Sequence, residues 1–149
     1  ENHLRILSGF YGILKPFDGV VPYRLEMQAR LKTAFCDNLY DYWQDDIYRD
    51  LTRDDTTILN LASAEYSKGV EKYLAAGVNY VTCRFGELSG GRVREKGVYV
   101  KMARGGMVRF MAENAVKDLA EIKEFNRLGY VYQAELSDDN TFVFAQTKK

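Results

Sequence analysis

A group of basic side chains in the second half of the chain has the types and spacing that bind phosphate. Lys101, Arg104 and Arg109 fall on one side of a helix predicted over residues 98–116, opposite its apolar side. The guanidinium group of arginine presents a planar fork of donors that matches phosphate oxygens. The spacing therefore predicts contact with a phosphate backbone. The predicted nucleic-acid or anion-binding residues are Lys15, Arg24, Lys101, Arg104 and Arg109.

Two consecutive glycines, Gly105 and Gly106, lie inside the same predicted helix. Each glycine in a helix interior costs about 1 kcal/mol relative to alanine, so some compensation is expected. One interpretation is that a neighbouring helix or strand packs tightly on Gly105 while the basic residues are only solvated. The other is that the low surface at Gly105 lets a phosphate backbone come close.

Two carboxylates, Glu26 and Glu65, are the candidates for proton transfer if the protein is an enzyme. Glu65 follows a predicted strand and lies in the first turn of a helix that Ser63 would cap; ligands of open α/β sheets bind where strands end. A helix cap and a favourable helix-dipole charge explain the same residues without a ligand. The residues expected to line a shared pocket are Ser8, Gly9, Tyr11, Gly12, Tyr23, Asn60, Ser63, Tyr66 and Gly105.

The opening stretch SGFYGILKPFDGVVPYRLEM, residues 8–27, contains the first members of that pocket. Ser8 and Gly9 follow a predicted strand and Gly12 comes four residues after Ser8, a spacing that lets backbone amides turn inward around an anion. The stretch lacks both the P-loop ending and the dinucleotide GxGxxG pattern, so a simple turn is the alternative. Pro16 and Pro22 restrict the loop and would present its side chains rigidly.

The elements that must position these residues alternate between strands and helices. Strands are predicted at 3–7, 23–31 and 57–62, with hairpins at 79–87/92–95 and 130–136/141–145; helices are predicted at 38–51 behind Asp37, 63–75, 98–116 and 118–125. This order predicts an α/β (mixed α+β) fold. We expect a single compact domain over residues 1–149, with a mixed sheet, flanking helices and two β-hairpins.

Apolar residues at helical spacing predict the core. In the helix over 98–116 the core-facing residues are Val100, Ala103, Met107, Phe110 and Met111, which fall within an arc of about 100°. In the helix over 38–51 they are Leu39, Trp43, Ile47 and Leu51, interpreted as core rather than as a platform for stacking bases.

Composition excludes several classes of function. The 149 residues carry 21 basic and 21 acidic side chains, which argues against a protein that coats nucleic acid by overall positive charge. No apolar run approaches a membrane span and no leader is recognisable, so we expect a cytoplasmic protein without membrane contact. Cys36 and Cys83 are expected to be free thiols, and with His3 as the one histidine we predict no metal site and no cofactor.

Four motifs lie in the same order as in a known family. They are LSGFYGILKPFDGVVPYRLEM at 7–27, NLYDYW at 38–43, LNLASAEY at 59–66 and YVKMARGGMVRFMAEN at 99–114. In these motifs the chain resembles the peroxide stress protein YaaA family, also called UPF0246. The resemblance is to the C-terminal part of that family, because its N-terminal Ser-Pro-Ala-Lys type motif has no counterpart here; we therefore expect an N-terminal segment to be missing.

The resemblance implies a cytoplasmic protein of the peroxide response that keeps free intracellular iron low. It also implies an α/β architecture with a positively charged cleft and a helix-hairpin-helix-like element that bind DNA. The resemblance implies no particular enzymatic reaction.

Two main hypotheses follow. The first is a DNA-binding stress protein whose binding is non-specific and sensitive to salt. The second is an enzyme that acts on a nucleotide, a nucleic-acid base or another small phosphorylated molecule, with a small anionic ligand in the same crevice. An interaction module without a ligand of its own is a third interpretation.

Overall fold

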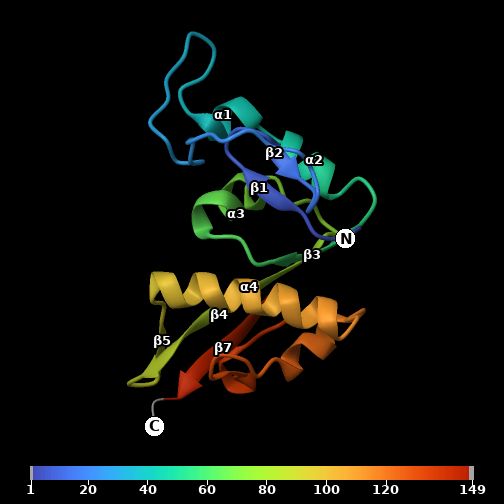
Figure 1. Cartoon of the computed structure of the whole chain (residues 1–149), viewed down its shortest axis with the longest axis vertical. Helices are drawn as coiled ribbons and strands as arrows, with labels where there is room; N and C mark the ends of the chain where they lie inside the picture. The colour runs from blue at the N-terminus through green and yellow to red at the C-terminus, as the bar shows by residue number, and fades with distance from the viewer. Residues whose placement is uncertain (1, 148–149) are drawn as a thin grey trace. The chain divides into compact units, whose positions relative to one another are not determined.

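The structure is a computed structural model that describes residues 2–147, and it confirms the predicted α/β fold with helices and a mixed sheet. The chain divides into two compact units, drawn together in Figure 1. Unit 1 comprises Glu1–Ile58 and Ala62–Asn79, and unit 2 comprises Leu59–Leu61 and Tyr80–Lys149. Each unit is described by itself.

Unit 1 contains a small hairpin and three short helices. Strand β1 (Ile6–Ser8) pairs antiparallel with β2 (Gly12–Leu14), and Gly12 has a φ of 72°, a left-handed conformation that glycine adopts without strain. The helices are α1 (Leu39–Trp43), α2 (Asp46–Leu51) and α3 (Ala64–Glu71). The hairpin therefore turns within the stretch whose amides were predicted to surround an anion.

The single helix predicted over 38–51 is wrong, because the structure has α1 and α2 in its place. Gln44 between them has a φ of 45°, which interrupts the helical hydrogen bonding. The side chain of Asn38, not of Asp37, caps α1 by accepting a hydrogen bond from the Asp41 amide. The predicted apolar side is retained, since Leu39 and Ile47 are buried.

The strand predicted over 23–31 is also wrong, because this segment has no strand partner and turns at the Glu26–Ala29 hydrogen bond. The segment is fixed instead by buried Met27 and by close contact with Gly9. A Cβ atom on Gly9 would come 2.7 Å from the carbonyl oxygen of Leu25, so only glycine allows this approach. Likewise α3 ends at Glu71, short of the predicted residue 75.

Unit 2 is built on the larger sheet. The strand order is β3-β4-β7-β6, with β5 paired to β4 outside this order. The strands are β3 (Thr57–Asn60, which begins in unit 1), β4 (Asn79–Ser89), β5 (Arg92–Arg94), β6 (Tyr130–Tyr132) and β7 (Thr141–Thr147). The β4 and β7 strands are parallel, whereas β4/β5 and β6/β7 are antiparallel, which confirms a mixed sheet and both predicted hairpins.

The helix α4 (Gly97–Glu113) runs along the unit 2 sheet, as Figure 1 shows, close to the predicted range. Val100, Ala103, Met107 and Phe110 are buried in the core as predicted, and Met111 is half-buried against it. The predicted helix over 118–125 is the 3₁₀ helix η1 (Leu119–Glu124), and the predicted strand over 130–136 stops early because η2 (Ala134–Leu136) follows β6. Aromatic packing centres on stacked Phe85 and Phe144, whose ring centroids lie 5.2 Å apart.

Within residues 2–147, no helix is long and apolar enough to cross a membrane. Both cysteines are free thiols, as predicted, with Cys83 buried and Cys36 half-buried.

Candidate functional site

The basic side of α4 carries donors that the described part of the chain does not satisfy. Lys101 is exposed, and no ion pair involves it in the described residues. Arg104 is half-buried, and its Nε atom is buried with no hydrogen-bond partner among residues 2–147. A buried N–H without an acceptor carries a free-energy cost, which would be removed if the Arg104 side chain moved outward to meet an anion at the helix surface.

Arg109 differs from the other two cations of α4 because it is paired. Its Nε lies 2.6 Å from Glu113 Oε1, and Arg127 Nη2 lies 2.5 Å from the other oxygen of the same carboxylate. The hydrogen bond from Arg109, followed by that from Arg127, lowers the pKa of Glu113. Arg109 therefore has part of its charge neutralised within the helix.

The two glycines of α4 have different surroundings. A Cβ atom on Gly106 would lie 3.6 Å from both Phe125 and Leu128 side chains, whereas one on Gly105 would meet no described atom within 4 Å. Tight packing on Gly105, one of the two interpretations from the sequence, is therefore not seen in the described part of the chain. The helix surface at Gly105 is open.

In the unit 1 hairpin, the amides that were predicted to surround an anion are already bonded. Ser8 is buried, and its Oγ accepts hydrogen bonds from the backbone N–H groups of Phe10 at 3.2 Å and Tyr11 at 2.9 Å. The turn therefore closes around the hydroxyl group of Ser8.

Ser8 is also bonded to a group of aromatic side chains, which we call the Tyr23 cluster. The hydroxyl oxygen of Tyr23 lies 2.5 Å from Ser8 Oγ. The rings of Phe10, Tyr11 and Tyr23 contact one another, with centroids 4.9 to 5.5 Å apart. The cluster consists of Ser8, Phe10, Tyr11, Tyr23 and Tyr66.

Tyr66 connects this cluster to the two candidate carboxylates. Burial, followed by the negative charge of Glu65, raises the pKa of Tyr66; Tyr23 and Glu26 add to the rise, while a backbone hydrogen bond with Met27 opposes it. The hydrogen bond with Met27 joins Tyr66, from the third motif, to the first motif, in which Ser8 and Tyr23 are bonded.

Tyr40 of α1 contacts α3. Its hydroxyl group donates a hydrogen bond of 2.8 Å to the backbone oxygen of Glu65. Ser63 is the N-cap of α3 as predicted, although its side chain makes no capping hydrogen bond.

The other predicted site residues lie elsewhere. Asn60 is buried on β3, where its amide nitrogen lies 3.3 Å from Thr82 Oγ1 in unit 2. Lys15 and Arg24 are exposed in unit 1, whereas the α4 cations belong to unit 2. A crevice shared by these two sets of cations remains a prediction.

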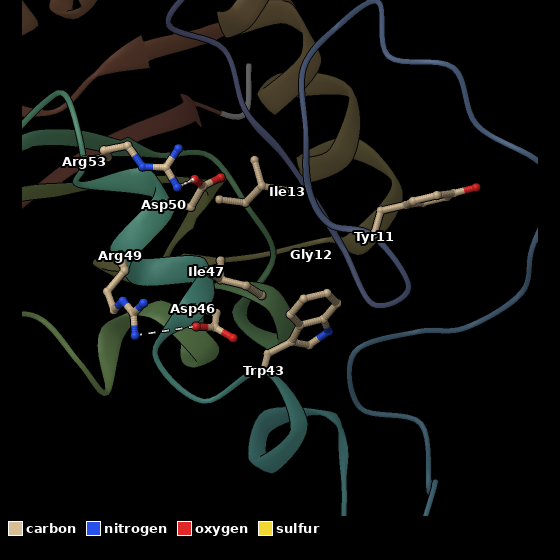
Figure 2. A pocket seen from close by; sticks show the side chains of 9 residues that line it. All are labelled: Tyr11, Gly12, Ile13, Trp43, Asp46, Ile47, Arg49, Asp50 and Arg53. Atoms are coloured by element: carbon tan, nitrogen blue, oxygen red, sulfur yellow. Dashed lines mark ion pairs between the residues drawn. The ribbon is translucent and has the colours of Figure 1, made fainter.

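A pocket of about 440 Å³ in unit 1 was not predicted (Figure 2). Trp43 lies beside the Gly12 backbone, where an added Cβ would come 2.9 Å from the indole ring, and its Nε1 donates to the Gly9 oxygen. Asp46 pairs with Arg49 and Asp50 with Arg53 at the rim, while Tyr11 points away. The lining residues are Tyr11, Gly12, Ile13, Trp43, Asp46, Ile47, Arg49, Asp50 and Arg53.

The sequence did contain a weak signal for this pocket. Aspartate and arginine alternate at helical spacing along 45–53, but the helix prediction for this segment rested on its apolar residues, with Trp43 interpreted as core. Between residues 2 and 147, no three potential histidine, cysteine or carboxylate ligands gather into a metal site.

Comparison with known proteins places the chain among close relatives. A family model described as "Peroxide stress protein YaaA" matches residues 1–136. A UPF0246 protein of Desulfitobacterium hafniense is 80% identical over 146 residues, which are 98% of this chain and 58% of that protein. UPF0246 proteins of Agathobacter rectalis and Clostridioides difficile are 54% and 40% identical, over 97% and 96% of this chain and 58% of each relative.

The chain thus spans a little under three fifths of the length of these relatives. The family match covers more than half of the chain, including all four motifs that suggested the resemblance. The chain belongs to the peroxide stress protein YaaA family.

Proposed function

We propose that the chain binds DNA non-specifically through the basic side of α4, as part of a peroxide-stress protein that helps to lower free intracellular iron and limit oxidative DNA damage. Family membership supports the role in peroxide stress. The observation that carries the DNA-binding part is the buried Nε of Arg104, which has no acceptor in the described residues. A phosphate oxygen supplies such an acceptor, together with a negative charge, once the Arg104 side chain moves outward from the helix.

The neighbours of Arg104 suit a phosphate backbone. Lys101 lies three residues earlier, so the two side chains are adjacent on the helix surface. Gly105 leaves the surface beside them open, which allows a strand to approach the helix closely. None of these contacts reads a base, so the binding does not depend on sequence.

The test is the affinity of the full chain for a labelled 20-base-pair duplex, measured by fluorescence anisotropy at fixed salt. We expect Lys101→Ala and Arg104→Gln each to weaken binding several-fold, equally for duplexes of different sequence. Lys32→Ala is the matched control, because Lys32 is exposed and already paired with Asp37. Equal effects of Lys32→Ala and Arg104→Gln would contradict the role of α4.

The effect on iron requires a separate measurement. Cells that produce the chain, and cells that produce the Arg104→Gln variant, are exposed to hydrogen peroxide, and chelatable iron is measured by electron paramagnetic resonance. We expect a lower iron signal with the unchanged chain than in cells without it. An unchanged signal would remove the iron part of the proposal and leave DNA binding to be judged by the anisotropy data.

A further inference from the structure

We infer that the Tyr23 cluster in unit 1 is a binding site for a nucleobase that carries an exocyclic amino group. The inference is separate from the proposed role of α4, since its residues belong to the other unit. It rests on three features of the cluster: the direction of its hydroxyl protons, an exposed aromatic surface, and carboxylates close by.

The hydrogen bonds of Ser8 fix the direction of the Tyr23 hydroxyl group. A serine oxygen has two lone pairs and one proton, and both lone pairs are used by the amides of Phe10 and Tyr11. The Ser8 proton must therefore point to the Tyr23 oxygen. Tyr23 accepts this bond and keeps its own proton for another acceptor, which no residue in the described part of the chain provides.

The rings beside this hydroxyl group form an exposed surface that is held in place. Phe10 is 53% and Tyr23 41% exposed, and their rings are 5.3 Å apart with an angle of 31° between their planes. Tyr11 contacts both rings edge-on, at 79°, and its hydroxyl accepts a hydrogen bond from the Val21 amide. A flat ring can stack on such a surface with little loss of side-chain entropy.

The carboxylates of Glu26 and Glu65 determine which kind of flat ring the cluster binds. The backbone of Glu26 lies beside Gly9, because an added Cβ on Gly9 would come 3.2 Å from the Glu26 carbonyl carbon, and Glu65 directly precedes Tyr66 in the chain. Carboxylates accept hydrogen bonds from exocyclic amino groups, as in the recognition of cytosine N4.

The ligand therefore needs an amino group for a carboxylate and a ring nitrogen or carbonyl oxygen for the Tyr23 proton. Cytosine, adenine and guanine have both, whereas thymine lacks the amino group. Such a base reaches the cluster either as an unpaired base of a DNA strand or as a free nucleotide. The chemistry of recognition is the same for both sources.

The test compares single strands that differ only in their bases. Affinities of the full chain for labelled 12-residue oligo(dC), oligo(dT) and an abasic strand of equal length are measured by anisotropy, and for free CMP by calorimetry. We expect oligo(dC) to bind more tightly than the other two. Because stacking on an aromatic side chain contributes substantially to binding, Phe10→Ala should weaken oligo(dC) binding about 5- to 150-fold and leave the abasic strand unchanged.

Phe17→Ala is the matched control, because Phe17 lies three residues after β2, outside the turn that carries Phe10, and is 81% exposed. Tyr23→Phe keeps the ring and removes the proton donor, so it should reduce the preference for oligo(dC) even if Phe10→Ala disturbs the hairpin. Competition by CMP would identify free nucleotides as a source; binding of oligo(dC) alone would identify unpaired DNA bases.

Equal affinity for oligo(dC) and the abasic strand, or equal effects of Phe10→Ala and Phe17→Ala, would overturn the inference. Arg104→Gln distinguishes this outcome from failure of the proposed function. That variant is expected to leave the ratio of oligo(dC) to abasic affinity unchanged, whatever it does to duplex binding.

Discussion

The two thiols of the chain have different surroundings, which predicts different reactivity. Burial raises the pKa of Cys83 to about 12, so its thiol stays neutral at physiological pH, and the thiolate is the nucleophile. Cys36 is half-buried in a loop. We expect iodoacetamide at pH 7.5 to label Cys36 alone in the folded protein and both cysteines in guanidinium, as measured by mass spectrometry. Rapid native labelling of Cys83 would show that its site opens readily.

The raised pKa of Cys83 also determines how the free energy of unfolding changes with pH above about 9. An unfolded chain ionises Cys83 near its ordinary value of 9.0, whereas the folded chain holds the proton until about pH 12. The unfolded state therefore binds fewer protons between these values, and the free energy of unfolding falls as pH rises above about 9. Urea unfolding at pH 8 and 10 measures the fall, and Cys83→Ala should reduce it.

The break between α1 and α2 gives a prediction at the scale of elements. Gln44 has a φ of 45° and a ψ of −124°, a conformation that favours glycine and strains other residues. We expect Gln44→Gly to stabilise the protein by about 1 kcal/mol, measured from the urea midpoint, because relief of strain exceeds the added entropy of the unfolded chain.

Gln28→Gly is the control, because Gln28 is exposed and has no positive φ. It should destabilise slightly or have no effect. Destabilisation by Gln44→Gly of the same size would mean that the Gln44 conformation stores no strain.

The elements that were predicted well are those with strong local signals. The helix α4 was predicted from the helical spacing of its apolar residues. The turn between β4 and β5 was predicted from Gly90 and Gly91, which both have a positive φ in the structure. The segment 23–31 was misassigned because its place depends on a distant contact, the approach of its backbone to Gly9. The break between α1 and α2 at Gln44 could not be predicted from the sequence either, because glutamine is an ordinary helix former.

At the scale of the whole molecule, the candidate site was predictable only in part. A pocket shared by residues 8–27 and 59–66 stays a prediction, although Tyr66 makes a hydrogen bond with the backbone of Met27. The bond between Ser8 and Tyr23 was not, because it joins side chains fifteen residues apart across an irregular loop. Similarly, the pocket beside Trp43 forms only where the hairpin meets the helices of unit 1.

The zero net charge of the chain leads to a prediction about the salt dependence of duplex binding. Since the formal net charge is zero, there is no overall positive charge to attract DNA, and the salt dependence of duplex binding reports local contacts. Each phosphate contact contributes about 0.9 to the slope of log affinity against log salt. Replacing both Lys101 and Arg104 should therefore reduce the magnitude of that slope by about 2, as measured by anisotropy between 50 and 200 mM salt, the range in which phosphate contacts lose affinity.

A paired control separates local contacts from total charge. Lys32→Ala with Arg53→Ala removes the same two positive charges, but both side chains are exposed and paired with aspartates in unit 1. We expect this double variant to keep the original slope, because counterion release depends on the cations that touch phosphate and not on the charge of the whole chain. If both double variants reduced the slope equally, the total charge would govern binding, and the assignment to α4 would be lost.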